Sequence, residues 1–254
     1  MNESVAVRKA RGGLAQDHRL RAAHDLMARV PAMAARRIAD VFSGEWSMRP
    51  LLARRFPGAR IEAFDLSHPC ARNGERLAGH LRAGGDPAGG RFDLVLCNGS
   101  LELLPSLPRL APALIATLAE GGCLAIQIPN DLYEPARALV RMIAAEEPWA
   151  EKLLPIAKTR PFNESMEGLY ALLSPIFASL DIWEATYLHV RRDVAAIAEL
   201  MQATRLAPFL AALELADRRK FLARYADELR EAYPAEPDGR VLIRLRRLFV
   251  VAQR

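Results

Sequence analysis

Residues 38–50, IADVFSGEWSMRP, combine a short apolar run that ends at an acid with a turn that contains one glycine and several bulky residues. An apolar strand that stops at Asp40 and turns into a helix is typical of the first strand of a nucleotide-binding α/β sheet. Such turns are normally glycine-rich, because glycine lets the backbone approach a nucleotide closely. Here Phe42, Glu45 and Trp46 occupy most of the turn. The stretch therefore predicts the sheet and leaves open whether a nucleotide binds there.

Segments of strand character and helix character alternate along the rest of the chain. The expected strands are 37–42, 60–66, 92–100, 123–130, 180–190 and 241–254, the last being a strand pair or one bent strand. The expected helices are 14–35 (interrupted at Pro31), 48–56, 70–82 and 108–119, with Gly121 and Gly122 as the stop of the last. Helical pieces with breaks at prolines are expected in 134–147, 164–173 and 193–229. This alternation predicts an α/β fold, a mostly parallel sheet covered on both faces, with the two late strands as an antiparallel edge.

Composition argues against several classes of protein. The chain has 254 residues, of which 51% are hydrophobic, enough for a large core. Its net charge of +5 comes mainly from scattered arginines, and without a dense basic tract we expect no nucleic-acid partner. Neither a metal site nor a disulfide framework is expected, because Cys70, Cys97 and Cys123 have no C-x-x-C spacing. No run approaches the roughly 18 apolar residues of a membrane span, and 1–13 lack a signal-peptide core, so we expect a soluble, cytoplasmic protein.

Polar residues follow the expected strands where parallel sheets bind ligands, at the carboxyl ends near the switch in strand order. This places Asp40, Gly44, Asp65 and Asn98 around one crevice. Asp65 can accept hydrogen bonds from both hydroxyls of a ribose, or it can cap the following helix. Gly44 allows one close backbone approach, or it is a plain turn residue. Asn98 can contact a cofactor or substrate, or it belongs to a simple Asn-Gly turn.

Candidates for acid–base chemistry are few, and no catalytic residue is assigned. His189 lies in the expected strand 180–190 beside a tyrosine and arginines, although a strand histidine more often packs than catalyses. No G-x-S-x-G motif, metal-ligand spacing or P-loop occurs in the sequence.

Several longer segments resemble one family over most of the chain, from about Leu20 to Gln253. They are FPGARIEAFDLS (56–67), FDLVLCNGSLELLPSL (92–107), LAEGGCLAIQIPND (118–131), LDIWEATYLH (180–189), FLARYADELREAYP (221–234) and RLFVVAQR (247–254). In these segments the chain resembles the trans-aconitate 2-methyltransferases, S-adenosylmethionine-dependent enzymes with the Rossmann-like methyltransferase fold. The resemblance implies transfer of a methyl group to a carboxylate of a small polycarboxylic acid.

The resemblance also implies roles for individual residues. Asp40 and Gly44 correspond to what remains of the first cofactor motif, and Asp65 corresponds to the ribose-binding acid. Four positions match residues suited to orienting an anionic substrate: Tyr170, Tyr187, His189 and Arg247. We expect one domain over 1–254, with an N-terminal helical segment 1–36, a cofactor-binding half 37–130, and a substrate half 131–254 that includes a helical cap 193–237.

The departures from the family pattern gather at the cofactor site. The family motif D-x-G-x-G-x-G has Phe42 and Trp46 in place of two glycines. A further family strand is shortened to HLRAGGDPAGGR (80–91), and the family's SLQWLPD becomes SLELLPS (100–106). These changes put S-adenosylmethionine binding in question. Three interpretations remain: an active carboxylate methyltransferase, a degenerate methyltransferase that binds a metabolite or a protein partner, and a fold reused for another reaction.

Overall fold

The computed structural model describes residues 20–42, 47–65, 91–99, 107–158, 165–203 and 205–254. These residues divide into two compact units. The sheet unit contains the described residues of Gln16–Pro129, Pro161–Ala185 and Arg247–Arg254, and the helical unit contains those of Asn130–Arg160 and Thr186–Arg246. The predicted domain boundaries stay a prediction.

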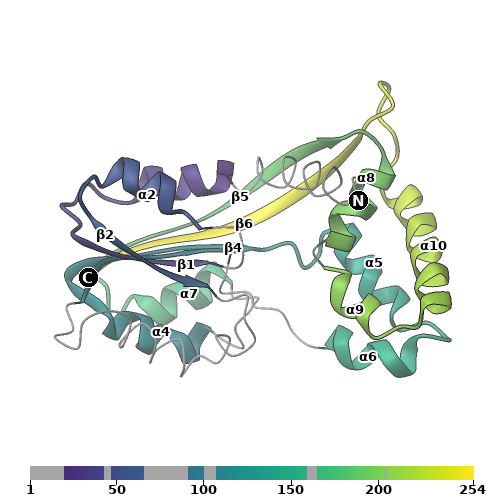
Figure 1. Ribbon diagram of the computed structural model, residues 1–254, viewed down its shortest axis with the longest axis horizontal. Helices are drawn as coiled ribbons and strands as arrows, with labels where there is room; N and C mark the ends of the chain where they lie inside the picture. Colours follow the sequence, from purple (N-terminus) through teal and green to yellow (C-terminus); the bar gives the residue numbers. More distant parts are fainter. Residues whose placement is uncertain (1–19, 43–46, 66–90, 100–106, 159–164, 204) are drawn as a thin grey trace, which may run out of the picture. The chain divides into compact units, whose positions relative to one another are not determined.

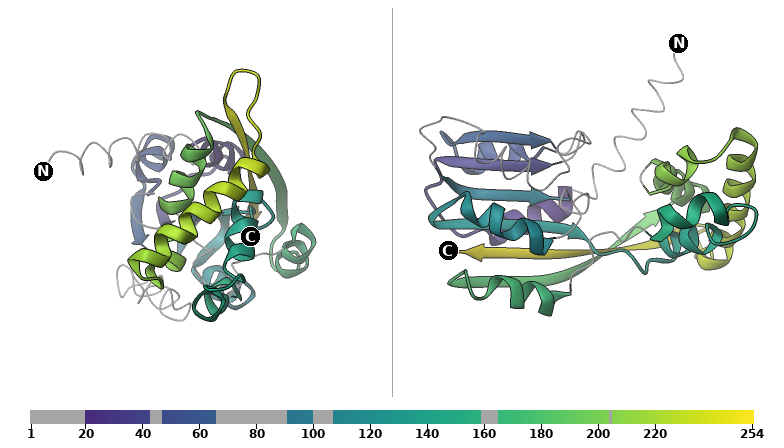
Figure 2. Two further views of the ribbon diagram at one scale, coloured as in Figure 1. Left: turned by 90° about the vertical axis from the view of Figure 1, so that its right-hand side faces the viewer. Right: turned by 90° about the horizontal axis from the view of Figure 1, so that it is seen from below.

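Six strands form one sheet in the order β2-β1-β3-β4-β6-β5. The strands are β1 Arg37–Phe42, β2 Arg60–Asp65, β3 Phe92–Asn98, β4 Leu118–Pro129, β5 Ser179–Arg191 and β6 Val241–Gln253. β2, β1, β3 and β4 pair in parallel, whereas β6 pairs antiparallel with β4. The right-hand view of Figure 2 shows the strands succeeding one another in this order. The predicted mostly parallel α/β sheet with an antiparallel edge is confirmed.

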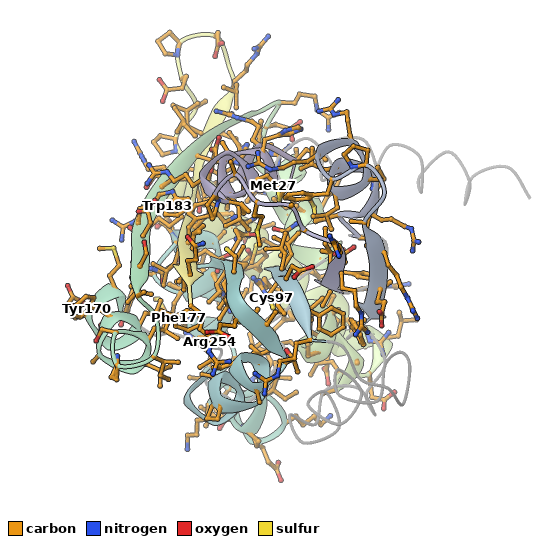
Figure 3. The ribbon with its side chains drawn as sticks, turned by 90° about the vertical axis from the view of Figure 1, so that its left-hand side faces the viewer. Met27, Cys97, Tyr170, Phe177, Trp183 and Arg254 are labelled. Carbon is orange, nitrogen blue, oxygen red and sulfur yellow. The ribbon has the colours of Figure 1, made fainter. Side chains whose placement is uncertain are left out.

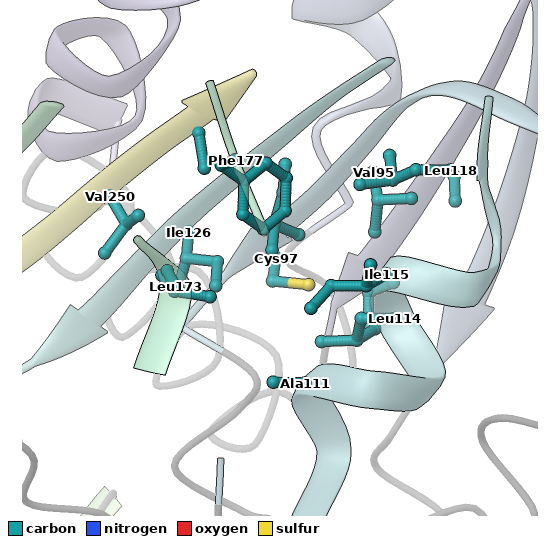
Figure 4. Close-up of a cluster of buried hydrophobic side chains, with 14 of the residues drawn as sticks. Val95, Cys97, Ala111, Leu114, Ile115, Leu118, Ile126, Leu173, Phe177 and Val250 are labelled. Carbon is teal, nitrogen blue, oxygen red and sulfur yellow. The ribbon is translucent and has the colours of Figure 1, made fainter. Parts of the chain in front are cut away.

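Helices cover both faces of the sheet unit (Figure 1). The helix of residues 20–29 and α2 (Arg49–Arg55) lie on one face, and α4 (Leu107–Ala116) and α7 (Met166–Leu173) lie on the other. On the α4 and α7 face, Val95, Cys97, Ile126 and Leu173 belong to one fully buried apolar cluster (Figure 4). The central strands are buried on both sides, which explains their nearly continuous apolar sequence.

An aromatic stack and an ion pair join the helix 20–29 to the late strands of the same unit. The Arg29 guanidinium binds Asp181 at 2.9 Å and lies 4.2 Å from the centre of the Trp183 ring. Trp183 in turn stacks on Phe249 of β6, with ring centroids 4.7 Å apart. Figure 3 shows Met27 of this helix and Trp183. The helix therefore contacts β5 directly, through Arg29.

The helical unit has its own apolar core. Its helices are α5 Pro135–Ile143, α6 Ala150–Lys158, α8 Val194–Ala203, α9 Ala207–Ala211 and α10 Leu215–Ala232 (Figure 1). Phe221, Tyr225 and Leu229 recur on α10 at helical spacing and are fully buried with residues of α5 and α8. Trp149, just before α6, packs edge-on against Phe221 with centroids 5.4 Å apart.

Most expected elements are confirmed, with corrections at their boundaries. Gly121 and Gly122 do not end α4: the helix stops at Ala116, where the Thr117 hydroxyl donates to the Leu114 carbonyl at 2.6 Å. The two glycines lie inside β4, which begins at Leu118 and changes register against β3. The C-terminal segment is one strand, β6, and the expected helix 70–82 lies outside the described residues.

No helix within the described ranges is long and apolar enough to cross a membrane.

Candidate functional site

The carboxyl ends of β1, β3 and β4 meet where the strand order reverses. The chain passes from β1 to β2 on one side and later enters β3 on the other side of β1. Asp40 pairs with Leu96, and Asn98 pairs with Gln127. Because paired residues of parallel strands point to the same face and side chains alternate along a strand, Asp40, Asn98 and Gln127 share one face. This edge is the place where open α/β sheets bind ligands.

Asp40 is fully buried and only one of its oxygens is satisfied. Its Oδ2 accepts from the Ser47 hydroxyl at 2.7 Å and from the Met48 backbone N–H at 2.8 Å. Its Oδ1 is buried without a hydrogen bond among the described residues. Burial raises the pKa of this carboxyl to about 6, although the bonds from Ser47 and Met48 act in the opposite direction. A buried carboxylate with one open oxygen is suited to a cationic or donor group.

Asn98 is held by a sulfur atom. Its Nδ2 donates to the Met48 thioether at 3.2 Å, and both residues are buried. Its Oδ1 is buried without a partner in the described part of the chain. Asn98 therefore presents a second open acceptor on the face that Asp40 shares.

Gln127 completes the group, and its role was missed in the sequence. It is 1% exposed, and its Nε2 has no hydrogen-bond partner among the described residues. The residue after β3 bonds to Gln127: Gly99, which has a φ of +62°, donates its backbone N–H to the Gln127 carbonyl at 2.8 Å. The available signal was a lone amide inside the apolar run CLAIQIP (123–129), since a buried amide needs partners.

Two buried acceptors and one buried donor, without hydrogen-bond partners among the described residues, thus lie near the carboxyl ends of β1, β3 and β4, at one edge of the sheet unit. Native interiors leave few buried polar atoms unpaired, so three at adjacent strand ends indicate a ligand site. An ammonium group matches the two acceptors, and a carboxylate matches the amide donor. The residues present therefore fit the amino-acid end of S-adenosylmethionine, which has both groups.

The other expected cofactor residues are only partly described. Asp65 ends β2 and pairs with Phe42, so its backbone lies one strand away from Asp40. Gly44 and Trp46 lie outside the described residues. Phe42 is buried at the end of β1, and strand alternation puts its ring on the face of Asp40.

The expected substrate residues of the sheet unit lie in different surroundings. Arg247 of β6 pairs with Pro129, two residues beyond the Gln127–Phe249 pair, so it shares the face of Gln127 near the same strand end. Tyr170 is 60% exposed on α7, whose buried residues pack on the opposite face, and Figure 3 shows it at the periphery. The structure therefore brings Arg247, but not Tyr170, to the sheet edge that holds Asp40, Asn98 and Gln127.

Tyr187 and His189 belong to the helical unit. Both are buried on β5, alternating with the exposed Leu188 and Val190. Arg191 continues the buried side of the strand, and burial lowers the pKa of its guanidinium. The strand therefore carries a tyrosine, a histidine and an arginine along one side.

The described residues hold no group of three or more metal-ligating side chains. Cys97 and Cys123 are buried free thiols, and burial raises the pKa of both, which disfavours a reactive thiolate.

Comparison with known proteins identifies the family. A family model described as "Methyltransferase domain" matches residues 17–166. Proteins named trans-aconitate 2-methyltransferase align over nearly the whole chain. That of Methylobacterium nodulans is 40% identical and covers 94% of each chain. That of Paracidovorax citrulli is 38% identical, covering 94% of this chain and 95% of its own. That of Rhodopseudomonas palustris (strain BisB18) is 37% identical, covering 93% and 94%.

Solved structures are more distant. Haemonchus contortus phosphoethanolamine N-methyltransferase 2 aligns over 93% of this chain and 52% of its own, with 13% identity and a TM-score of 0.46, from which nothing follows for this protein. The near full-length relatives and the matching domain decide the assignment. The chain belongs to the trans-aconitate 2-methyltransferase family of S-adenosylmethionine-dependent methyltransferases with a Rossmann-like fold.

Proposed function

We propose that the chain binds S-adenosylmethionine at the carboxyl ends of β1, β3 and β4 and methylates a carboxylate of a small polycarboxylic acid. The observation behind the proposal is the set of open buried atoms: Asp40 Oδ1, Asn98 Oδ1 and Gln127 Nε2. Near full-length relatives named for 2-methylation of trans-aconitate support the substrate class.

Each residue then has a definite task. Asp40 and Asn98 accept from the α-ammonium group of the cofactor, and the negative charge of Asp40 offsets its positive charge. Gln127 donates to the α-carboxylate. Asp65, by family resemblance, accepts from the ribose hydroxyls. Ligand binding also supplies the partners that these buried groups lack.

The reaction asks little of the protein beyond alignment. When bound, S-adenosylmethionine would supply a methyl group on a positively charged sulfur. A substrate carboxylate oxygen would form a bond to the methyl carbon as the carbon–sulfur bond breaks and S-adenosylhomocysteine leaves, with little proton transfer. Holding the reactants in line can therefore supply most of the rate. Arg247 offers a guanidinium for a non-reacting carboxylate on the face of Gln127. Tyr187 and His189 are further substrate residues by resemblance, and so is Tyr170, although the structure does not bring Tyr170 to this edge. A cytoplasmic location stays a prediction.

Calorimetric titration with S-adenosylmethionine and S-adenosylhomocysteine tests the proposal. We expect the wild type to bind in the micromolar range. Gln127→Leu should bind at least about tenfold more weakly, because a hydrogen bond to a charged group is lost. The same change removes a buried unpaired donor, so the unfolding free energy should stay level or rise. Thr117→Val, which loses a buried hydroxyl outside this edge, is the matched control and should bind as the wild type.

Wild-type protein that is folded and binds neither ligand would refute the proposal. If binding is found, a screen of di- and tricarboxylic acids for methyl esters by mass spectrometry should identify the acceptor. A screen without any ester, with the cofactor bound, would refute carboxylate methylation.

One observation favours a degenerate methyltransferase as the second candidate. Phe42 is buried at the end of β1 on the face of Asp40, where the family pattern has glycine. A ring there takes up volume that the backbone motif normally leaves to the cofactor. If the wild type does not bind, the double change Phe42→Gly and Trp46→Gly should create binding. No gain in a folded double variant would instead place the defect in the shortened segment 80–91.

A further inference from the structure

We infer that Met48 is a positioning residue, which decides the atoms that Asp40 and Asn98 present to the ligand. This inference rests on the proposed function, because the ligand is the amino-acid end of the cofactor. Met48 lies outside the motif positions 40–46, immediately before α2, and it is 5% exposed. It contacts both residues, one through its backbone and the other through its side chain.

The backbone contact fixes the carboxyl group of Asp40. The Met48 N–H at 2.8 Å and the Ser47 hydroxyl at 2.7 Å both donate to Oδ2. With two donors on one oxygen, the other oxygen, Oδ1, is the atom left for a ligand. Any residue other than proline at position 48 could donate the backbone bond, so this contact does not depend on methionine.

The side-chain contact does depend on methionine. A thioether sulfur accepts hydrogen bonds and donates none, so the face of the Asn98 amide toward it must be the NH2 group. At 3.2 Å from Nδ2, the Met48 sulfur therefore decides that Oδ1 is the open atom. Without the sulfur, the amide loses the acceptor that sets its orientation and can turn its donor toward the ligand instead.

This orientation matters for the charge of the ligand. With Oδ1 open, Asn98 and Asp40 together offer two acceptors, which suits an ammonium group. With the amide reversed, Asn98 would present a donor to a donor and disfavour the ammonium. Met48 thus favours ligands with an α-ammonium group over analogues that lack one.

Met48→Leu is the direct test, because leucine has a similar volume and no acceptor. Titrations should use S-adenosylhomocysteine and an analogue of it that lacks the α-amino group. We expect Met48→Leu to bind S-adenosylhomocysteine about tenfold more weakly. The affinity for the deaminated analogue should stay within about twofold of the wild-type value, since no ammonium is involved. Met27→Leu, at a buried methionine of helix 20–29 in the same unit, is the matched control and should change neither affinity.

The other outcomes are decisive. An unchanged affinity of Met48→Leu for S-adenosylhomocysteine overturns the inference and leaves the proposed function standing. An equal loss for both ligands also overturns it, because that is the result of a packing defect. Wild-type protein that binds neither ligand overturns the proposed function and the inference together.

Discussion

The buried carboxyl group of Asp40, which has one oxygen without a hydrogen bond among the described residues, lowers the unfolding free energy of the ligand-free protein. Burial raises the pKa of this carboxyl from 3.8 to about 6. The folded state therefore binds the proton more tightly than the unfolded state, and the unfolding free energy falls as pH rises from about 4 to about 6. A shift of this size corresponds to about 3 kcal/mol above pH 6. The penalty is fully present near neutral pH.

We therefore expect Asp40→Asn to stabilise the free protein at pH 8 by about 1 to 3 kcal/mol and to weaken cofactor binding. The gain should vanish near pH 4, where the wild-type carboxyl is protonated. Urea unfolding between pH 4 and 8 measures this. Asp238→Asn, at an exposed turn before β6, is the control and should show no such gain. Equal stability of Asp40→Asn and the wild type at pH 8 would contradict the buried charge.

The sequence predicted part of this residue constellation. Asp40 and Asn98 follow apolar runs, so a position near the carboxyl ends of two strands could be inferred: Asn98 is the last residue of β3, whereas Asp40 lies two residues before the end of β1. Gln127 was missed because Ile126 and Ile128 flank it, and hydrophobicity alone gave a buried strand. Met48 was missed because its role depends on a contact with β3, fifty residues away. Contacts of that kind leave no local pattern.

The pairing of β3 and β4 contains an irregularity at the glycine pair, where the sequence predicted a helix end. A glycine pair after a helical stretch normally indicates a helix end. Here Leu118 already pairs with Phe92, and the next pair along the ladder is Leu94 with Cys123. The intervening residues of β4 bulge out of the ladder. Strand pairing, a tertiary interaction, therefore overrode the helix-stop signal.

The two glycines of this bulge should respond differently to alanine. A Cβ at Gly122 would lie 2.8 Å from the Ala119 carbonyl oxygen, a backbone atom that moves only with the strand. We expect Gly122→Ala to cost about 2 to 3 kcal/mol in urea unfolding. Gly121 has a φ of +70° and open space around a Cβ, so Gly121→Ala should cost only about 1 kcal/mol. Equal losses would mean that the bulge adapts to the added methyl group.

In the helical unit, two tyrosines, one in α10 and one directly after it, form hydrogen bonds with the first turn of α5. The Tyr233 hydroxyl donates to Glu134 at 2.6 Å and accepts from the Ala136 N–H at 2.8 Å. The Tyr225 hydroxyl donates to the Ala136 carbonyl at 2.8 Å. Burial raises the pKa of Glu134, and the bond from Tyr233 partly offsets that effect.

Tyr233→Phe should therefore destabilise the protein by about 2 kcal/mol, since a partly buried carboxylate loses its donor. The pKa of Glu134 rises further in the variant, so the loss should be larger at pH 8 than at pH 4, where the acid is protonated. Tyr225→Phe loses a bond to a neutral carbonyl and should cost about 1 kcal/mol at either pH. Chemical unfolding at the two pH values separates these outcomes, and a pH-independent loss at Tyr233 would contradict the coupling to Glu134.

The three polar atoms of the proposed cofactor site that are unpaired among the described residues all belong to the sheet unit. Asp40, Asn98 and Gln127 lie on three of its parallel strands. Tyr187 and His189, predicted from family resemblance to orient the substrate, lie in the part of β5 that belongs to the helical unit. The sequence alternation predicted the sheet, because local periodicity encodes it. It did not predict how two long strands are shared between units, since that depends on packing far along the chain.

The distribution of these residues predicts that substitutions in the two units affect different constants, the cofactor affinity in one case and the substrate KM in the other. His189→Gln should leave the calorimetric affinity for S-adenosylmethionine within about twofold, and should raise the KM for the carboxylic acid by about tenfold through loss of a charge-assisted bond. Gln127→Leu should do the reverse, with its main effect on cofactor affinity. Val190→Ala, at the exposed neighbour on β5, is the control and should change neither constant. A loss of cofactor affinity in His189→Gln, with the fold intact by circular dichroism, would mean that His189 acts on the cofactor instead. The predicted cofactor half 37–130 and substrate half 131–254 would then not describe how this chain divides its work.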